Sequence, residues 1–195
     1  MNSRFYYFGP LLFHTEINEN DLNKINSLCH KDENLNHRKH LAGHINDEFR
    51  IDYKKLESIL DLYFDDYKNC FYNFYGYRMD FYINSAWVNY MKAGEFNPMH
   101  THDNCDLSAV LFLSIPDDIK EENINFKGNK NGVTVGPGEL RFFAFPSIKR
   151  YITEKGFFPK RGDLFIFPNN LSHYVAPFES NVERVSVAFN MKEKN

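Results

Sequence analysis

The fold is decided by residues 78–114, which read RMDFYINSAWVNYMKAGEFNPMHTHDNCDLSAVLFLS. Two runs rich in Val, Ile, Phe and Tyr, near 78–92 and 107–114, flank a stretch interrupted by Gly, Asn, Pro and Asp. Such runs are typical of β-strands, and the residues between them are typical of turns. This part of the chain therefore predicts two strands joined by an irregular connection.

The same pattern continues to the C-terminus. Further strands are predicted near 139–145, 162–168, 172–178 and 183–190. Irregular connections are predicted at stretches such as 117–132 and 146–161. Many short strands divided by turn residues indicate a sandwich, a jelly roll or a barrel.

Upstream of Gly76 the pattern is helical instead. A short helix is predicted over Glu19–His30, and a longer one over residues 53–74, where apolar side chains recur at i, i+3, i+4 and i+7. Asp52 can cap the start of the longer helix, and Gly76 can end it. The apolar stripe of this helix predicts packing against a sheet.

The chain has 195 residues, enough for one domain with a sizeable core. We expect a single α+β, mainly β domain over 1–195. Its helical part, about 1–76, would pack on one outer face of a barrel core, about 77–195.

Composition excludes several classes of protein. The net charge is −3 with acids and bases interspersed, so no basic stripe favours a nucleic-acid or membrane-surface partner. The three cysteines form no C-x-x-C pair, which favours a reducing compartment. No apolar run approaches the length of a membrane span. We therefore expect a cytoplasmic protein with no nucleic-acid or membrane partner.

A candidate metal site lies in residues 94–106, which read GEFNPMHTHDNCD. Side chains two residues apart on a strand point to the same side, so His100 and His102 would face one cavity. Imidazole pairs of this kind suit Fe, Zn, Cu or Ni. Asp106 could reach the same point if the chain bends at Asn104.

The third candidate ligand is His173, in the segment GDLFIFPNNLSHYVAP at residues 162–177. A strand that ends at Pro168 and then turns would deliver this histidine at the start of the next strand, as a jelly roll does for a distant ligand. The remaining histidines lie in the polar N-terminal third. We expect surface or hydrogen-bonded roles for His14, His30, His37, His40 and His44.

The last two predicted strands give a second clue. If they form a hairpin with its turn centred at 180–181, His173 lies opposite Ala188, and cross-strand partners point to the same face. The residues that would then share the cavity side with His173 are Arg184, Ser186, Ala188 and Asn190.

Arg184 is the candidate anion-binding residue. It lies four residues from Ala188, about 13 Å along a strand, so it is too far away to touch the metal. A guanidinium inside a barrel needs an anion, and a carboxylate fits its two-pronged geometry while Ser186 adds a hydroxyl donor. The alternative is a structural ion pair of Arg184 with Glu183 or Asp163.

These segments resemble the 2-oxoglutarate/Fe(II) oxygenase superfamily, especially a prolyl-hydroxylase-like group frequent in marine bacteriophages. The resemblance covers most of the chain. Its segments are Phe8-Gly9-Pro10-Leu11-Leu12, Leu41-Ala42-Gly43-His44, Trp87-Val88-Asn89-Tyr90, Phe96-Asn97-Pro98-Met99-His100-Thr101-His102, Cys105-Asp106-Leu107-Ser108, Gly162-Asp163, Phe167-Pro168, His173 and Glu183-Arg184-Val185-Ser186.

The resemblance implies a double-stranded β-helix, a cupin-like jelly-roll barrel that binds Fe(II). It also implies a dioxygenase, a hydroxylase by expectation, with 2-oxoglutarate and O2 as co-substrates. Its primary substrate would be a protein residue such as proline, or a small molecule. A phage-encoded protein of this kind would act in the host cytoplasm.

The resemblance also implies roles for single residues. His100 carries over as the first metal ligand and His173 as the distal ligand. Arg184 with Ser186 carries over as the co-substrate anchor, and Asn89 on the preceding strand would line the same pocket.

One departure from the superfamily concerns its carboxylate ligand. The superfamily usually has His-x-Asp or His-x-Glu, whereas this chain has His100-x-His102. Either His102 fills the carboxylate position, which gives three histidine ligands, or Asp106 replaces it and His102 lies behind the ligands. Strand alternation favours His102.

Two other interpretations remain open. Residues 94–106 and 162–177 also resemble the two cupin motifs, with Asp106 in place of the usual Glu. A cupin-type metal dioxygenase or isomerase would use four ligands and no 2-oxoglutarate. The other interpretation is a jelly-roll binding module whose histidines hold no metal.

Overall fold

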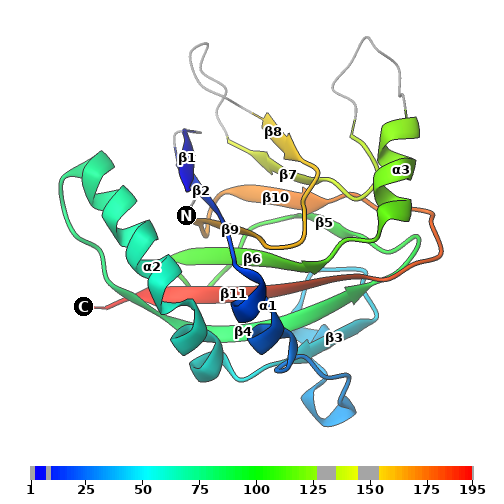
Figure 1. The fold of residues 1–195 in the computed structure, drawn as a ribbon, viewed down its shortest axis with the longest axis horizontal. Helices are drawn as coiled ribbons and strands as arrows, with labels where there is room; N and C mark the ends of the chain where they lie inside the picture. The colour runs from blue at the N-terminus through cyan, green and yellow to red at the C-terminus, as the bar shows by residue number, and fades with distance from the viewer. Residues whose placement is uncertain (1–2, 8–9, 127–134, 145–153, 195) are drawn as a thin grey trace.

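The computed structural model describes residues 3–7, 10–126, 135–144 and 154–194, which form two antiparallel sheets (Figure 1). The larger sheet has the order β1-β2-β9-β6-β11-β4-β3, and the smaller has the order β5-β10-β7-β8. The larger sheet consists of β1 (Arg4–Tyr7), β2 (Leu11–Glu16), β3 (Asp47–Arg50), β4 (Phe81–Met91), β6 (Leu107–Ser114), β9 (Asp163–Pro168) and β11 (Arg184–Glu193). The smaller consists of β5 (Asn97–His100), β7 (Leu140–Phe143), β8 (Glu154–Phe157) and β10 (Ser172–Val175). The predicted double-stranded β-helix is confirmed.

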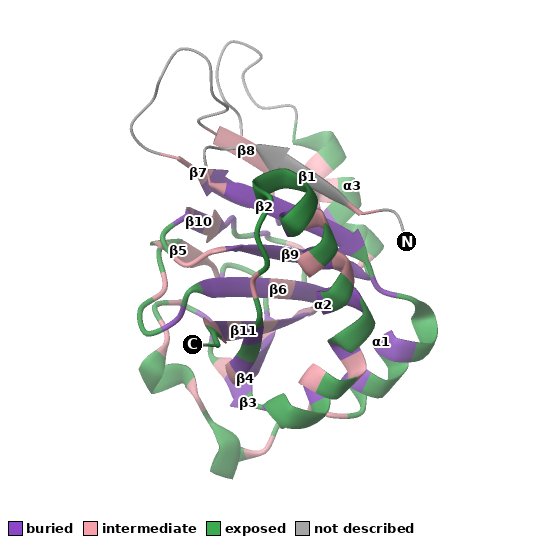
Figure 2. Ribbon diagram, turned by 90° about the vertical axis from the view of Figure 1, so that its left-hand side faces the viewer, coloured by how far each residue is buried: buried purple, intermediate pink, exposed green. Residues whose placement is uncertain are grey.

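The helices lie outside the barrel. The α-helices are α1 (Glu19–Asn26), α2 (Tyr53–Tyr75) and α3 (Asp117–Asn125), and two short 3-10 turns are η1 (Glu33–Leu35) and η2 (Arg38–His40). As predicted, α1 and α2 cover one outer face of the larger sheet (Figure 2), with their buried residues turned toward it. Across the described segments, no helix is both long and apolar enough to span a bilayer.

The long helix α2 begins and ends where the sequence predicts. The Asp52 side chain accepts hydrogen bonds from the first backbone N–H groups, and Gly76 ends the helix at a positive φ of 77°. Phe64 of α2 contacts two rings of the sheet, with centroid distances of 5.2 Å to Phe81 and 6.1 Å to Phe189. The helix thus closes the outer face of the sheet.

Strand β11 separates this core from the interior of the barrel. Val187 and Phe189 are fully buried among the residues that pack under α2. Arg184 and Ser186 point the other way and line a cavity between the two sheets. The period of two along one strand therefore divides apolar core from polar cavity.

The predicted C-terminal hairpin is wrong. Strands β10 and β11 belong to different sheets, so His173 lies opposite His100 and Phe142 rather than Ala188. The predicted cavity side of β11 is nevertheless the observed one, because the sheets face each other and the alternation along β11 is unchanged. The residues of β11 that line the cavity are Arg184, Ser186, Ala188 and Asn190.

Several elements differ from the expectation. Strands β1, β2 and β3 lie in the part predicted to be helical, and strands β5 and β8 were not expected. Helix α3 occupies part of the stretch 117–132 that was predicted to be irregular; Ile119 is its one buried residue, so it shows no apolar stripe. Residues 127–132, 145–153 and 8–9, on which parts of these expectations depend, lie outside the described residues.

Candidate active site

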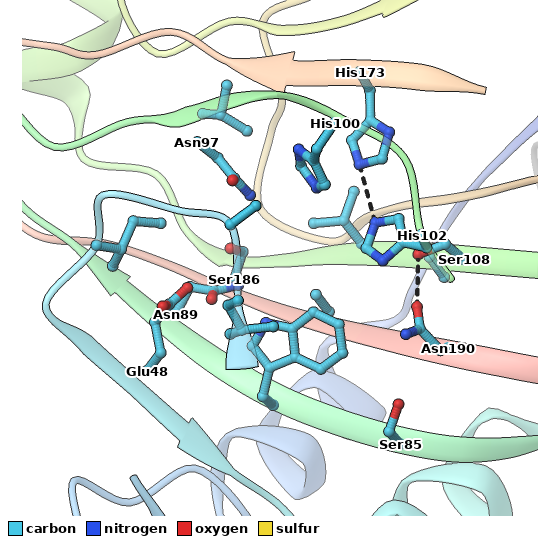
Figure 3. A pocket seen from close by; sticks show the side chains of 18 of the residues that line it. Glu48, Ser85, Asn89, Asn97, His100, His102, Ser108, His173, Ser186 and Asn190 are labelled. Carbon is cyan, nitrogen blue, oxygen red and sulfur yellow. Dashed lines mark hydrogen bonds between the residues drawn. The ribbon is translucent and has the colours of Figure 1, made fainter. Parts of the chain in front are cut away.

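The cavity between the sheets has a volume of about 400 Å³ and gathers most of the residues singled out from the sequence. Both sheets contribute to its walls, and so does the segment of residues 37–48. Figure 3 shows three histidine side chains converging in it, with a group of polar side chains to one side.

Three imidazoles meet at one point of this cavity. One nitrogen from each of His100, His102 and His173 lies within 4.8 Å of the others. The antiparallel pairing of β5 with β10 places His100 directly opposite His173. His102 follows β5 and brings its Nε2 to 3.2 Å from Nε2 of His173. Two nitrogens that each lie about 2.1 Å from one ion, at roughly a right angle, would be about 3 Å apart.

Backbone carbonyls fix the orientation of two of these rings. Nδ1 of His100 donates to the carbonyl oxygen of Pro98 at 2.7 Å, and Nδ1 of His173 donates to that of Leu171 at 2.9 Å. A carbonyl can only accept, so the proton is on Nδ1 and the lone pair of Nε2 is free to bind a metal. The two ligands are therefore held in the same tautomer by the same local contact.

Burial keeps the cluster uncharged. It lowers the pKa of His102 to about 4, and it lowers the pKa of His173 well below the usual histidine range. The charge that protonated neighbouring imidazoles would carry acts in the same direction. Neutral imidazoles are the form that binds a metal, so the site needs no deprotonation at neutral pH.

Asp106 is not part of this cluster. The chain does bend at Asn104, which has a positive φ of 59°, but the bend leads the carboxylate away. Oδ2 of Asp106 accepts a hydrogen bond from the backbone N–H of Glu193 at 2.8 Å, at the end of β11. Within the described parts of the chain, the group that could hold a metal ion contains three histidines and no carboxylate.

Arg184 is a buried cation in the cavity wall. It is 2% exposed, and burial lowers its pKa to about 10. Its guanidinium lies over the ring of Phe112, with 5.4 Å from Cζ to the ring centroid. Nη1 donates a long hydrogen bond of 3.4 Å to the Gly138 carbonyl, and Nε has no partner among the residues that the structure describes.

The structural ion pairs considered for Arg184 do not form. Glu183 binds Lys31 at 2.6 Å, and Asp163 binds His14 at 2.8 Å. A buried cation without a carboxylate partner is costly unless a ligand supplies the anion. Arg184 therefore meets the requirement for an anion-binding residue.

Ser186 and Asn89 line the same cavity as Arg184. They are paired across β11 and β4, and both line the cavity. Ser186 lies two residues after Arg184 along β11. Figure 3 shows Ser186 near Asn89, with Asn190 of the same strand nearer His102.

Part of the cavity wall was not expected from the sequence. His37 and His40 have the hydrogen-bonded and surface roles expected of them, since His37 accepts from Arg50 at 3.1 Å and His40 is exposed, but both also line the cavity. Glu48, Trp87 and Asn97 line it as well. Glu48 faces the cavity because it alternates along β3 with Phe49, which packs in the apolar core, but a four-residue strand is too short for the sequence to show this alternation. The segment 37–48 otherwise carries no regular pattern.

Comparisons with known proteins agree with this arrangement. Residues 85–190, more than half of the chain, match the family described as putative 2OG-Fe(II) oxygenase. No curated protein matches the chain.

Solved structures show the same fold at low sequence identity. A prolyl-4-hydroxylase from Pseudomonas putida has a TM-score of 0.57 and 18% identity, with 94% of this chain and 93% of that chain covered. An oxidoreductase of the 2OG-Fe(II) oxygenase family from Burkholderia pseudomallei has a TM-score of 0.55 and 18% identity, with 90% and 79% covered. A viral collagen prolyl hydroxylase from Paramecium bursaria Chlorella virus-1, solved as a 2OG complex, has a TM-score of 0.53 and 12% identity, with 94% and 96% covered.

Proposed function

Because the chain belongs to the 2OG-Fe(II) oxygenase family, we propose that it is a hydroxylase that couples 2-oxoglutarate decarboxylation to oxidation of a C–H bond. Membership makes it an oxidoreductase whose cofactors are Fe(II) and 2-oxoglutarate. The proposed net reaction converts 2-oxoglutarate, O2 and R–H into succinate, CO2 and R–OH. The observation that carries the proposal is a buried guanidinium, without a carboxylate partner among the described residues, in the same cavity as three converging imidazoles.

The donor set fits iron. His100, His102 and His173 would hold the metal through neutral imidazole nitrogens, which suit Fe(II). Three ligands leave positions open for a co-substrate. When bound, iron supplies the activation of dioxygen and the oxidation of the substrate. The protein orients the ligands through the Pro98 and Leu171 carbonyls.

Arg184 and Ser186 are proposed to bind the far carboxylate of 2-oxoglutarate. The guanidinium can form two parallel hydrogen bonds to it, and the Ser186 hydroxyl can add a third. The ring of Phe112 limits where the guanidinium can lie. Asn89, opposite Ser186, is proposed to line the same pocket.

The primary substrate is proposed to be a protein residue such as proline, or a small molecule. Prolyl hydroxylases occur among the similar structures, and one from Trichoplax adhaerens was solved with a peptide fragment of hypoxia inducible factor. The cupin alternative requires a fourth ligand at Asp106, whose carboxylate binds the Glu193 N–H instead. That placement favours a three-ligand centre with room for 2-oxoglutarate.

The test measures 2-oxoglutarate binding by calorimetry under anaerobic conditions, and then succinate formation in air, on protein purified with Fe(II). Arg184→Gln should retain the metal but weaken 2-oxoglutarate binding about 100-fold, because a charged contact to a buried partner is lost. Arg161→Gln removes an arginine that pairs with Glu19 outside the cavity and should change neither measurement. An iron-loaded protein that does not bind 2-oxoglutarate would refute the proposal.

A further inference from the structure

Glu48 is a buried acid in the cavity wall that the proposed reaction does not use. It lies on β3, at the edge of the larger sheet, opposite Asn89 of β4. Its side chain lines the cavity although the residue is 1% exposed. Oε2 has no hydrogen-bond partner in the described parts of the chain, and burial raises the pKa of the carboxyl to about 7.

A second acceptor lies beside Glu48. Oδ1 of Asn97, on β5, is also buried and without a partner among the described residues. A Cβ on Gly43 would stand 3.3 Å from this oxygen and 3.5 Å from Oε1 of Glu48. Gly43 does not have a positive φ, so its backbone does not require glycine. The missing side chain instead leaves space next to two acceptor oxygens.

The charges around Glu48 do not neutralise it. Arg38 lowers and Glu95 raises the pKa of its carboxyl, but both effects are smaller than that of burial. Arg38 is exposed and donates to Asn46, and Glu95 accepts from the Asn46 side chain at 2.6 Å. Arg184, the cation inside the cavity, forms no ion pair with Glu48. Among the described residues of the cavity, the Arg184 guanidinium therefore has no anionic partner and the Glu48 carboxyl has no cationic partner.

Aromatic rings line the same cavity as this acid and the three histidines. The Trp87 ring centroid lies 6.3 Å from that of His102, and the His37 centroid lies 5.7 Å from that of Trp87. Burial lowers the pKa of His37 to about 4, with further lowering from Arg50 and His40, so its ring is uncharged at neutral pH. Such a wall attracts an organic cation through its ring faces and does not repel it.

We propose that Glu48 and Asn97 form the binding subsite for the primary substrate, and that the substrate carries a protonated nitrogen, either an ammonium or a guanidinium group. The inference rests on the proposed function, in which 2-oxoglutarate binds to Arg184 and Glu48 is free to bind the primary substrate. A cation on the substrate gives the buried carboxylate a partner that the described residues do not supply. With a neutral substrate the buried carboxyl would instead favour its protonated, uncharged form.

Binding of matched probes tests the charge of the ligand. L-Arginine is compared with its neutral analogue L-citrulline, and L-lysine with L-norleucine, by calorimetry on the full chain with Zn(II) and 2-oxoglutarate. A capped Gly-Arg-Gly peptide distinguishes a peptide side chain from a free amino compound. At least one cationic probe should bind tenfold or more tightly than its neutral partner. Absence of any charge preference, including absence of binding, overturns the proposal.

Two variants test whether Glu48 and the space beside Gly43 cause the preference for cationic probes. Glu48→Gln should abolish the charge preference, whereas Glu121→Gln, which removes an exposed acid on α3, should leave it unchanged. Gly43→Ala places a methyl group beside both oxygens without changing any charge, and it should weaken cation binding severalfold. Thermal melting shows that each variant is folded. A preference that survives Glu48→Gln in folded protein overturns the assignment.

The same samples separate this inference from the proposed function. Glu48→Gln should lose cation preference, and Arg184→Gln should lose 2-oxoglutarate affinity. Failure of the wild-type protein to bind 2-oxoglutarate rejects the proposed function, while cation selectivity still reports on Glu48. Equal loss of both ligands in Glu48→Gln would mean that Glu48 belongs to the co-substrate pocket, and it would overturn the inference.

Discussion

At the scale of single residues, the proposed metal site depends on His102, in the position where the superfamily usually has a carboxylate. A third imidazole leaves the ligand set uncharged, whereas an aspartate would contribute a negative charge. The ring stacks on that of His173, with centroids 5.1 Å apart and 6° between the planes. The backbone N–H of His102 also donates to the Asn169 carbonyl at 2.9 Å, which fixes the segment after β5. The neighbouring ring of His173 and the backbone of Asn169 thus hold His102 in place.

Loss of this ring should weaken metal binding. We expect His102→Ala to lower the affinity for Fe(II) on the order of 100-fold or more, because loss of outer contacts alone costs 10–100-fold. His102→Asp should retain much of the affinity, since it restores the usual His-x-Asp pattern. Asp106→Ala is the control, and its affinity should equal that of the wild type. Anaerobic competition titration gives the constants, and equal losses in the alanine variants would contradict a three-histidine centre.

Arg184 should cost stability in the ligand-free protein. Its guanidinium is buried, and no described residue gives it a carboxylate partner, so replacing it by an apolar side chain of similar length removes a desolvation penalty. We expect Arg184→Met to raise the unfolding free energy by about 1–3 kcal/mol and to raise the Tm by several degrees. Scanning calorimetry without ligands measures this. A destabilised Arg184→Met protein would show that the guanidinium is a structural element rather than an anion-binding residue.

Glu48 should make stability depend on pH. Its folded-state pKa is raised to about 7 from an ordinary value of 4.5, so the unfolded chain releases the proton first. Stability is therefore lost as the pH rises from about 4.5 to 7, and the loss is complete above that window. The free energy of unfolding of Glu48→Gln, relative to that of wild type, should therefore increase by on the order of 2–3 kcal/mol as the pH rises from 4 to 8. Denaturant titrations of both metal-free proteins across this pH range measure the two free energies. If their difference does not change with pH, the pKa of Glu48 is not raised in the folded protein.

At the scale of elements, sequence pattern predicted the long, regular pieces. Helix α2 was predictable because its apolar stripe, its Asp52 cap and its Gly76 end all agree. Strands β4, β6 and β11 were predictable because they are long and rich in branched and aromatic residues. Strands β3 and β5, of four residues each, are too short to show a period, and they read DEFR and NPMH.

Strand pairing was harder to predict than strand position. Neighbouring strands in the sequence usually pair, which favoured a hairpin of β10 and β11. In this fold the chain instead crosses between the sheets at 176–183, so both strands pair with distant partners. His100, His102, His173 and Arg184 were still predictable, since alternation decides the face of a strand whatever its neighbours are. Glu48 was not, because its contact with the cavity depends on the pairing of β3 with β4.

Helix α2 offers a matched pair of leucines that tests its packing. Leu60 is fully buried against the sheet, whereas Leu62 on the same helix is 67% exposed. We expect Leu60→Ala to lower the unfolding free energy by about 2–5 kcal/mol, and Leu62→Ala to change it by less than about 0.5 kcal/mol. Urea denaturation gives both values. Similar effects from the two substitutions would mean that α2 does not pack on the sheet through this face.

At the scale of the whole molecule, the site joins the two sheets. His100 and His173 lie on the smaller sheet, and Arg184 and Ser186 lie on the larger one. A 2-oxoglutarate molecule held at both ends would therefore connect sheets that otherwise meet through apolar side chains, such as Phe142 and Phe167 with ring centroids 5.0 Å apart. Co-substrate binding and barrel stability are consequently expected to be linked.

This linkage predicts a non-additive response to ligands. Anything that binds only the folded state raises its stability, and two ligands that favour each other raise it by more than the sum of their separate effects. We expect Zn(II) with 2-oxoglutarate to shift the Tm by several degrees more than the two single shifts combined. In Arg184→Met the shift from Zn(II) should persist, whereas the additional shift from 2-oxoglutarate should disappear. Differential scanning fluorimetry measures all of these combinations. If 2-oxoglutarate contacts both the metal on one sheet and Arg184 on the other, binding of the two ligands must be coupled. Tm shifts that simply add in the wild-type protein would therefore mean that the metal and 2-oxoglutarate bind without contacting each other.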